Sequence, residues 1–334
     1  MEEGTPMKNF TEMRIVVVGK TGSGKSSLAH TIFGEEQSPN KSVFNSETTK
    51  CEAKTKDVDG KCITLIDCPG FFDTNMSEDE KKPEIMRCIT ECAPGPHAFL
   101  IVLKIERFTE QEQSVITKLC EYFSDEALKH AVVVFTYGDQ LPEGTKIDEF
   151  VHENKLLSDL VKKCGNRCHV VDNRYWRKGS VDEYRSNQFQ VKELLHTVET
   201  MMKTNENSFF TNEMLQKVDE EIREEEAKIR QEAGNKSEKE IKQKAKDEVL
   251  KKLMIRCAGI AVGVLLGALF GVFCPVGLAI IFRAGLGVLG GEIVGCLAAI
   301  GAATVQQAAK KVTEAAKGAA KATLKKVTSI KKDL

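Results

Sequence analysis

A glycine-rich loop at residues 19–27, GKTGSGKSS, constrains the fold more than any other feature of the sequence. It matches G-x-x-x-x-G-K-[ST] without a mismatch, follows the apolar run RIVVV, and opens a helical pattern. In such a loop, backbone N–H groups and a helix N-terminus converge on phosphate, Lys25 reaches the β- and γ-phosphates, and Ser26 binds Mg²⁺. The residues predicted to bind nucleotide phosphates are Gly19, Thr21, Gly22, Ser23, Gly24, Lys25, Ser26 and Ser27.

Residues 14–203 alternate short apolar runs with helical patterns, which is typical of an α/β domain. The apolar runs are nearly continuous and rich in β-branched residues, as are strands buried on both faces. These runs cover 14–19, 62–70, 97–105, 131–136 and 168–173, and helical periodicity covers 26–33, 84–92, 110–122, 146–163 and 181–202. Asp59-Gly60 between two runs predicts one antiparallel hairpin. We therefore expect a mainly parallel sheet with helices on both faces.

Two later motifs indicate a guanine nucleotide. The sequence DCPG at 67–70 ends an apolar strand, so Asp67 can hold Mg²⁺ through water and the Gly70 N–H can sense a γ-phosphate. The sequence FTYGD ends a later strand and places Asp139 to accept hydrogen bonds from guanine N1 and N2. Adenine lacks this pair of donors and would leave the carboxylate unpaired. A P-loop kinase or ATPase is therefore disfavoured, and a surface turn is the alternative role for Asp139.

Three segments carry a family resemblance. The sequence GPHAFLIVLKIERFTEQEQ at 95–113 is similar to a hydrophobic box that lies between two nucleotide motifs. The sequence SETTKC at 46–51 is similar to a switch I, and the sequence IDCPGFFDT is similar to a third G motif. Through them, residues 14–202 resemble the GTPases of immunity-associated proteins (GIMAP family), whose plant relatives are named for avirulence-induced expression. The resemblance implies a Ras-like P-loop G domain, close to septins and chloroplast translocon GTPases. It also implies GTP or GDP with Mg²⁺ as ligands and a role in vertebrate immunity.

The same resemblance assigns further site residues. Thr48 is the expected ligand of Mg²⁺ and the γ-phosphate, with Thr49 as the alternative, so the predicted metal-binding set is Ser26, Thr48 and, through water, Asp67. Thr136 and Tyr137 begin the fourth G motif, where family members commonly have Thr followed by a basic residue. Tyr137 could instead stack on the base. Asn173, which ends the strand of the fifth motif, is the candidate for a further base contact.

The residue after Gly70 is Phe71, where a Ras-type protein has the Gln that positions attacking water. We therefore expect slow intrinsic hydrolysis. Relatives compensate by dimerising across the nucleotide face, which makes Arg107 a candidate catalytic residue supplied in trans from the second copy of a homodimer. The alternative role for Arg107 is an exposed surface charge. The alternative function is a nucleotide-locked membrane scaffold with negligible GTP hydrolysis.

Overall composition narrows the functional classes. The net charge is −1, so nothing global indicates nucleic acid binding. The eleven cysteines include no C-x-x-C pair, and the six histidines are isolated, so neither indicates a metal site. The N-terminal sequence is too polar for a secretory signal, which favours a cytoplasmic protein with reduced thiols.

The C-terminal part of the sequence has a different character. A charged helical pattern with a thin apolar stripe covers residues 204–253, for which a coiled coil is one interpretation and a solvated helix packed on the first domain is another. Next comes a glycine-rich apolar segment, in which glycines recur every fourth residue, as in membrane helices that pack closely. The two series are Gly259, Gly263, Gly267 and Gly271, followed by Gly287, Gly291 and Gly295.

Lysines and arginines flank both ends of the apolar segment, which favours a hairpin with both ends on the cytosolic side. Arg283 and Glu292 oppose insertion of its second limb, because a central charge costs roughly 2.5–3.5 kcal/mol. A soluble helical hairpin is the alternative.

We therefore predict a GTP-binding switch that self-associates through its G domain. It would be tethered at the cytosolic face of an intracellular membrane through lipid contacts of residues 257–305. The predicted organisation is a tail at 1–13, the G domain at 14–203, a charged helical extension at 204–253, an apolar hairpin at 254–305 and a basic tail at 306–334.

Overall fold

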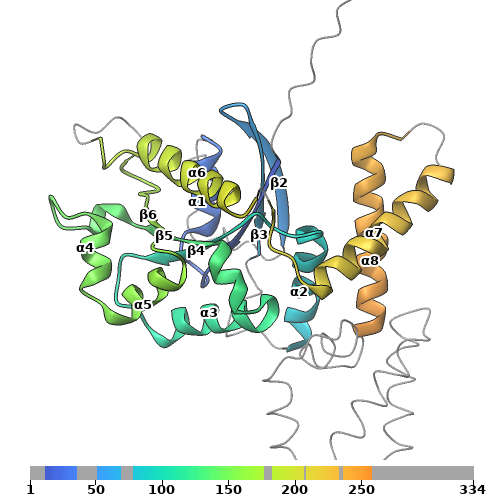
Figure 1. Ribbon diagram of the computed structural model, residues 1–334, viewed down its shortest axis with the longest axis horizontal. Coiled ribbons are helices and arrows are strands. Elements are labelled where there is room, and N and C mark those ends of the chain that lie inside the picture. Colours follow the sequence, from blue (N-terminus) through green and yellow to red (C-terminus); the bar gives the residue numbers. More distant parts are fainter. Residues whose placement is uncertain are drawn as a thin grey trace, which may run out of the picture. The chain divides into compact units, whose positions relative to one another are not determined.

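The computed structural model describes residues 12–35, 51–68, 78–176, 183–206, 208–232 and 236–257. The chain divides into two compact units. One consists of residues 1–75 and 95–211, and the other of residues 76–94 and 212–334. Figure 1 shows the helices and strands of both units.

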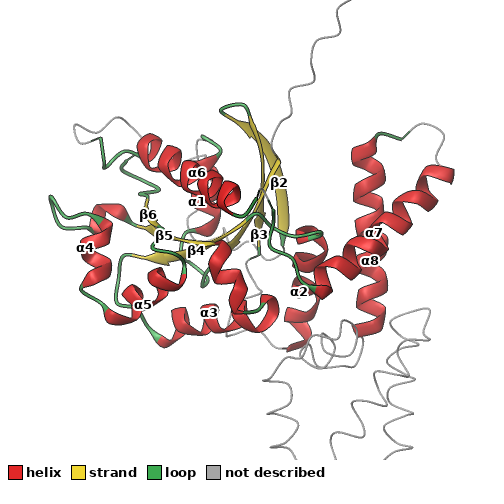
Figure 2. Ribbon diagram, viewed as in Figure 1, coloured by secondary structure: helices red, strands yellow, loops and turns green. Residues whose placement is uncertain are grey.

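A six-stranded sheet forms the first unit, with strand order β2-β3-β1-β4-β5-β6 (Figure 2). Its strands are β1 (Glu12–Val18), β2 (Glu52–Val58), β3 (Lys61–Asp67), β4 (Ala98–Lys104), β5 (Ala131–Thr136) and β6 (Cys168–Val170). Among these strands, β2 and β3 pair antiparallel and every other pair is parallel. This topology confirms the predicted Ras-like α/β fold, and Asp59-Gly60 forms the turn of the expected hairpin.

The helices of this unit follow the expected alternation with strands. They are α1 (Lys25–Ile32), α3 (Glu110–Phe123), α4 (Ile147–His152), α5 (Lys155–Lys163) and α6 (Asn187–Thr204), with short 3₁₀ turns η2 (Asp125–His130) and η3 (Gly138–Gln140). The single helix predicted over 146–163 is wrong, because Asn154 caps a new helix by accepting hydrogen bonds from the Leu156 and Leu157 N–H groups. The helix predicted from residue 181 begins at Asn187 instead.

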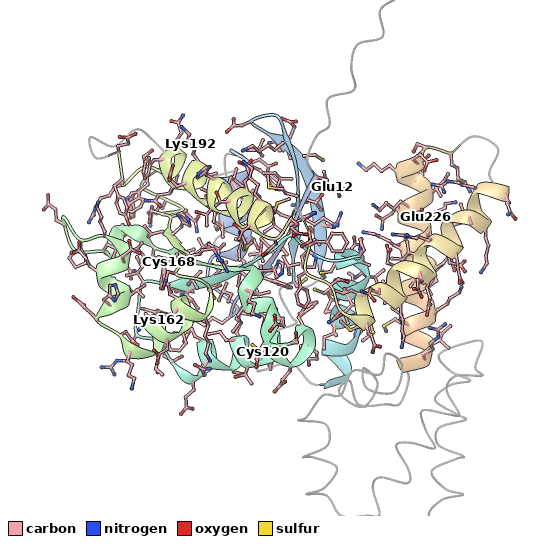
Figure 3. All side chains as sticks on the ribbon, in the orientation of Figure 1. Glu12, Cys120, Lys162, Cys168, Lys192 and Glu226 are labelled. Atoms are coloured by element: carbon pink, nitrogen blue, oxygen red, sulfur yellow. The ribbon has the colours of Figure 1, made fainter. Side chains whose placement is uncertain are left out.

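The core lies on both faces of the sheet, because successive strand residues point to opposite sides. On one face, Ile15 and Val17 of β1 belong to a buried cluster with Leu28 of α1 and Leu194 of α6. The central strand β4 is buried along its length up to Leu103, so its residues contribute to both faces. Side chains fill the space between the sheet and its helices in Figure 3. The strands whose carboxyl ends carry the predicted motifs are thus packed on both faces.

On the opposite face of the sheet, Phe99 of β4 contacts Phe123 of α3, with ring centroids 5.2 Å apart. Phe135 of β5 contacts Phe150 of α4 in the same layer. Aromatic pairs at these separations are favourable beyond their buried area. They therefore fix α3 and α4 beside the strands whose ends carry the predicted motifs.

Helices α2 (Glu78–Cys92), α7 (Glu213–Glu232) and α8 (Glu238–Cys257) make up the described part of the second unit. Ion pairs join Glu221 to Arg256 at 2.6 Å and Glu225 to Lys252 at 2.5 Å, so α7 and α8 form an antiparallel hairpin. Figure 3 labels Glu226 on the same helix α7. The predicted apolar stripe is buried at Leu215, Val218 and Ile222.

The predicted apolar hairpin at 254–305 lies outside the described residues beyond Cys257. In the described part of the chain, each helix is too short or too polar to cross a membrane. Membrane contact and a coiled coil both remain predictions.

Candidate nucleotide-binding site

The phosphate loop connects the carboxyl end of β1 to the first turn of α1. Gly24 has a left-handed backbone (φ 91°) immediately before the helix, a conformation that favours glycine. At Gly19, a side-chain Cβ would lie 2.5 Å from the Val102 carbonyl oxygen, so only glycine lets the loop approach β4 this closely. The Leu28 N–H donates to the Gly24 carbonyl at 2.8 Å and starts the helix there. The N–H groups of this helix N-terminus are the feature that favours an anion.

The metal-binding residues predicted on α1 and β3 meet at the end of this loop. The Ser26 hydroxyl donates to Asp67 Oδ2 at 2.8 Å. The second oxygen, Asp67 Oδ1, is buried and has no hydrogen-bond partner among the described residues. Burial raises the pKa of Asp67, while the Ser26 hydrogen bond and the nearby Lys25 oppose that shift. A hydroxyl beside an under-bonded carboxylate is a hard-oxygen donor set that fits Mg²⁺.

Lys25 is buried and donates to the Gly19 and Lys20 carbonyl oxygens at 2.9 and 3.0 Å. Its ammonium group therefore lies inside the curve of the loop. An ammonium held there supplies positive charge where the loop and the helix N-terminus already favour an anion.

Thr136 and Asn173 contact the phosphate loop and the helix that follows it. The Thr136 hydroxyl is fully buried and donates to the Ser23 carbonyl at 2.7 Å, with the Leu103 carbonyl as a second, more distant acceptor at 3.2 Å. Asn173 accepts a hydrogen bond from the Thr31 hydroxyl of α1 at 3.0 Å. Both side chains also lie beside Gly24, where an added Cβ would contact them. These contacts link the strands of the fourth and fifth motifs to the phosphate loop.

The fourth motif lies at the end of β5. Tyr137 has a left-handed backbone (φ 62°) and a partly exposed ring, and Lys104 Nζ lies 5.1 Å from its centroid. Lys104 thus places a cation next to the ring of Tyr137. The ring of Trp176 packs against Gly138, where an added Cβ would lie 2.6 Å from an indole carbon. Glycine is therefore required between Tyr137 and Asp139.

Asp139 is exposed and forms a carboxyl pair with buried Asp172. Burial and the hydrogen bond with Asp172 raise the pKa of Asp139. Burial alone would raise the pKa of Asp172, but hydrogen bonds from the Tyr175 N–H, Asp139 and the Arg174 N–H hold that pKa below its ordinary value. Of the two carboxyls, Asp139 therefore takes up a proton more readily than Asp172 does.

An ion-pair network holds the phosphate loop to the segment that contains Arg107. Lys20 contacts Glu106 at 2.7 Å and also the buried carboxylate of Glu112. Glu112 accepts from the Thr109 N–H at 3.0 Å and completes a capping box at the start of α3. Arg107 itself is exposed.

Sequence reasoning missed Asp172, Lys20 and Glu112 as members of the site. The one signal that could have indicated the first two is a charged residue inside a predicted motif, Lys20 in GKTGSGKSS and Asp172 in CHVVDN. The sequence T-E-Q-E at 109–112 indicates that Glu112 belongs to a capping box. Nothing in that pattern indicates its contact with Lys20. Among the predicted site residues, Thr48, Gly70 and the position of Phe71 lie outside the described part of the chain. Thr21, Gly22 and Ser27 lie in the loop and its first helical turn, as expected.

Comparison with known families identifies the chain. The model of the AIG1 family matches residues 13–232. The chain belongs to the AIG1 family. This match covers the described sheet, the phosphate loop and helix α7, and it confirms the resemblance stated from sequence.

Individual relatives of this AIG1-family chain come from a plant and from human. Immune-associated nucleotide-binding protein 9 of Arabidopsis thaliana is 32% identical over 195 residues, which are 57% of this chain and 55% of that protein. GTPase IMAP family member 8 of Homo sapiens is 30% identical over 198 residues, 59% of this chain and 28% of that protein. The chain thus spans about half of the length of the first relative and about a quarter of the length of the second.

Solved structures provide a further comparison. The crystal structure of Toc33 from Arabidopsis thaliana in complex with GDP and Mg²⁺ is 19% identical, with a TM-score of 0.45. The match covers 61% of this chain and 89% of that chain. A dimerisation-deficient mutant of Toc33 matches with the same TM-score at 18% identity.

Proposed function

We propose that this AIG1-family chain is a guanine-nucleotide switch that binds GTP and GDP with Mg²⁺. The observation that carries the proposal is the Ser26–Asp67 pair at the mouth of the phosphate loop, with Asp67 Oδ1 buried and under-bonded. A divalent cation would relieve that carboxylate and neutralise phosphate charge, which is the chemistry Mg²⁺ supplies in such sites. Names of relatives that include nucleotide binding and GTPase support the same conclusion.

At the phosphate end, the chain supplies positive charge from three sources. Backbone N–H groups of residues 22–27 and the start of α1 attract the phosphates, and Lys25 adds a full charge inside the loop. Ser26 and Asp67 would hold Mg²⁺, with Thr48 as the proposed third residue. The hydrogen bond from Thr136 to the Ser23 carbonyl supports the shape of this loop.

At the base end, Asp139 would accept hydrogen bonds from guanine N1 and N2. Its carboxyl is exposed just after β5, beside the carboxyl of Asp172. Guanine would replace Asp172 as the partner of this carboxyl and favour its ionised form. Adenine offers no equivalent donors, so selectivity for guanine would come from the unpaired carboxylate that adenine leaves. Asn173, in its contact with Thr31, would hold the base loop in place.

Base selectivity is tested by Asp139→Asn. An amide in place of the carboxylate can donate to the second carbonyl of xanthine, so affinity for GTP should fall by at least about 100-fold while affinity for xanthosine triphosphate rises. The matched control is Glu143→Gln, an exposed acidic residue in the same loop. Fluorescence titration of labelled nucleotides measures both affinities. If Asp139→Asn bound GTP as tightly as the unaltered chain does, the assignment of Asp139 would be wrong.

Hydrolysis would be slow in the monomer and faster in a homodimer that supplies Arg107 in trans. The network of Lys20, Glu106 and Glu112 supports this proposal, because it holds the Arg107 segment against the phosphate loop while leaving Arg107 exposed. A guanidinium supplied to a neighbouring active site can raise phosphoryl-transfer rates by roughly 10³–10⁵-fold in analogous systems. Negligible turnover at every concentration would instead favour the nucleotide-locked scaffold.

We also propose attachment to the cytosolic face of an intracellular membrane through residues 257–305. The glycine periodicity and flanking positive charges of that segment support it. The basic tail would add attraction to anionic lipid. The nucleotide state would then control self-association at that surface, in the immune role that the names of the relatives suggest.

A further inference from the structure

Two thiols lie opposite each other where the β2–β3 hairpin opens toward the nucleotide motifs. The antiparallel register pairs Glu52 with Asp67, so Cys51 and Cys68 are the next facing positions. Their Sγ atoms are 3.0 Å apart, and both side chains are buried, at 3% and 1% exposed. Directly opposed residues on an antiparallel pair have Cβ atoms about 4.5–5.5 Å apart, close to what a disulfide spans.

We propose that Cys51 and Cys68 form a site of reversible oxidation, which a peroxide converts into a cross-strand disulfide. In a first step, one thiol reacts with hydrogen peroxide to give a sulfenic acid and water. The second thiol then displaces hydroxide from that sulfenic acid, which forms the S–S bond and a second water. Each sulfur gives up one electron and the peroxide accepts two. Closing the bond needs an approach of about 1 Å, since a disulfide is about 2.04 Å long.

The edge position of β2 gives an oxidant its access. Buried thiols are inert unless the structure opens locally. Strand β2 is the edge of the sheet, and residues 52–57 are exposed. A strand with so little buried apolar surface separates from its neighbour at low free energy, which exposes Cys51 first.

The bond would join the two nucleotide-sensing segments. Cys51 is the last residue of the segment that resembles switch I, and Cys68 directly follows Asp67 in DCPG. A covalent link there would restrain both segments at the points where they leave the sheet. The next expectation rests on the proposed function. Oxidation should lower the ratio of the GTP affinity to the GDP affinity by on the order of fivefold or more.

Peptide mapping of the full chain tests the site without any nucleotide. After treatment with hydrogen peroxide, a disulfide between the Cys51 and Cys68 peptides should appear, with a mass loss of about two hydrogens that dithiothreitol reverses. Cys51→Ser should abolish the linked peptide. Cys62→Ser is the matched control, because Cys62 lies on the same hairpin opposite Asp57 and should leave the link intact. A link from either residue to another cysteine, or oxidation that stops at sulfinic acid, would overturn the proposal.

The functional consequence is read from GTP and GDP affinities of the oxidised and the reduced chain. A fall in the ratio of the two affinities on oxidation, restored by dithiothreitol and absent in Cys51→Ser, supports the restraint. If the ratio of GTP and GDP affinities stayed unchanged when the disulfide was fully formed, the proposed restraint would be wrong. Failure of the reduced chain to bind GTP would refute the proposed function and leave the mapped bond standing.

Discussion

Replacing Thr136 with Val tests whether this residue acts through the phosphate loop. The two side chains have nearly the same shape, but Val has no hydroxyl to donate to the Ser23 and Leu103 carbonyl oxygens. Losing a hydrogen bond costs about 0.5–1.5 kcal/mol, and leaving a buried carbonyl unpaired costs about 1–3 kcal/mol. Ser23 is 1% exposed, so water cannot readily replace the lost donor. We expect the free energy of unfolding to fall by about 2 kcal/mol.

The assay is urea unfolding followed by fluorescence of Trp176, the one tryptophan of the chain, which packs on Gly138 in the same unit. A loss of about 2 kcal/mol corresponds to a melting temperature lower by roughly 4–8 °C. Affinity for GDP should fall on the order of fivefold, because the loop loses its support. Thr136→Ser is the control, since it keeps the hydroxyl. If Val and Ser variants lost equal stability, or if Val lost none, the reasoning would be refuted.

Three further predictions concern pH, hydrolysis and the membrane. Burial lowers the pKa of His97 and of His169 to about 4, from 6.5, so between these pH values the unfolded chain binds more protons than the folded chain. Stability should therefore be complete above about pH 6.5 and fall toward pH 4, by up to about 1.4 kcal/mol per pH unit for each histidine, and His169→Gln should flatten that fall in urea titrations. The GTP hydrolysis rate per monomer should rise with protein concentration, and Arg107→Ala should abolish that rise without weakening GTP binding; a rate independent of concentration would exclude the dimer mechanism. After a carbonate wash, the full chain should remain with membranes and a chain ending at Cys257 should not, whereas equal release of both would exclude the anchor.

Strands and motifs with local signals were predictable from the sequence. The apolar run RIVVV predicts β1, and the glycine-rich loop directly after it predicts the phosphate-binding site. Both signals are local, because they lie in adjacent residues. Asp59-Gly60 likewise predicted the hairpin, since a tight turn is a local property. The mainly parallel sheet was predicted from the alternation of elements, and the Ras-like fold from the family resemblance, whereas the strand order came from the structure.

Contacts between residues distant in sequence were not predictable. Thr136 lies 113 positions from Ser23, and no local pattern shows that its hydroxyl faces the loop carbonyl. The pairing of Asp139 with Asp172 also depends on β5 lying beside β6. The break before Asn154 had a local signal, since Asn is a common N-cap, but helical periodicity on both sides concealed it. Sequence patterns thus predicted the candidate site, and the structure added contacts between its residues that the sequence does not show.

The account depends most directly on a purine triphosphate site that requires Mg²⁺ and selects guanine. Thermal unfolding of the full chain should be measured with GTP and with ATP, each with Mg²⁺ and with EDTA. At a GTP concentration about 100 times the dissociation constant, stabilisation should be about 2.7 kcal/mol, a rise of roughly 5–11 °C, with a smaller rise in EDTA. An equal rise with ATP, or no rise with GTP, would contradict the account.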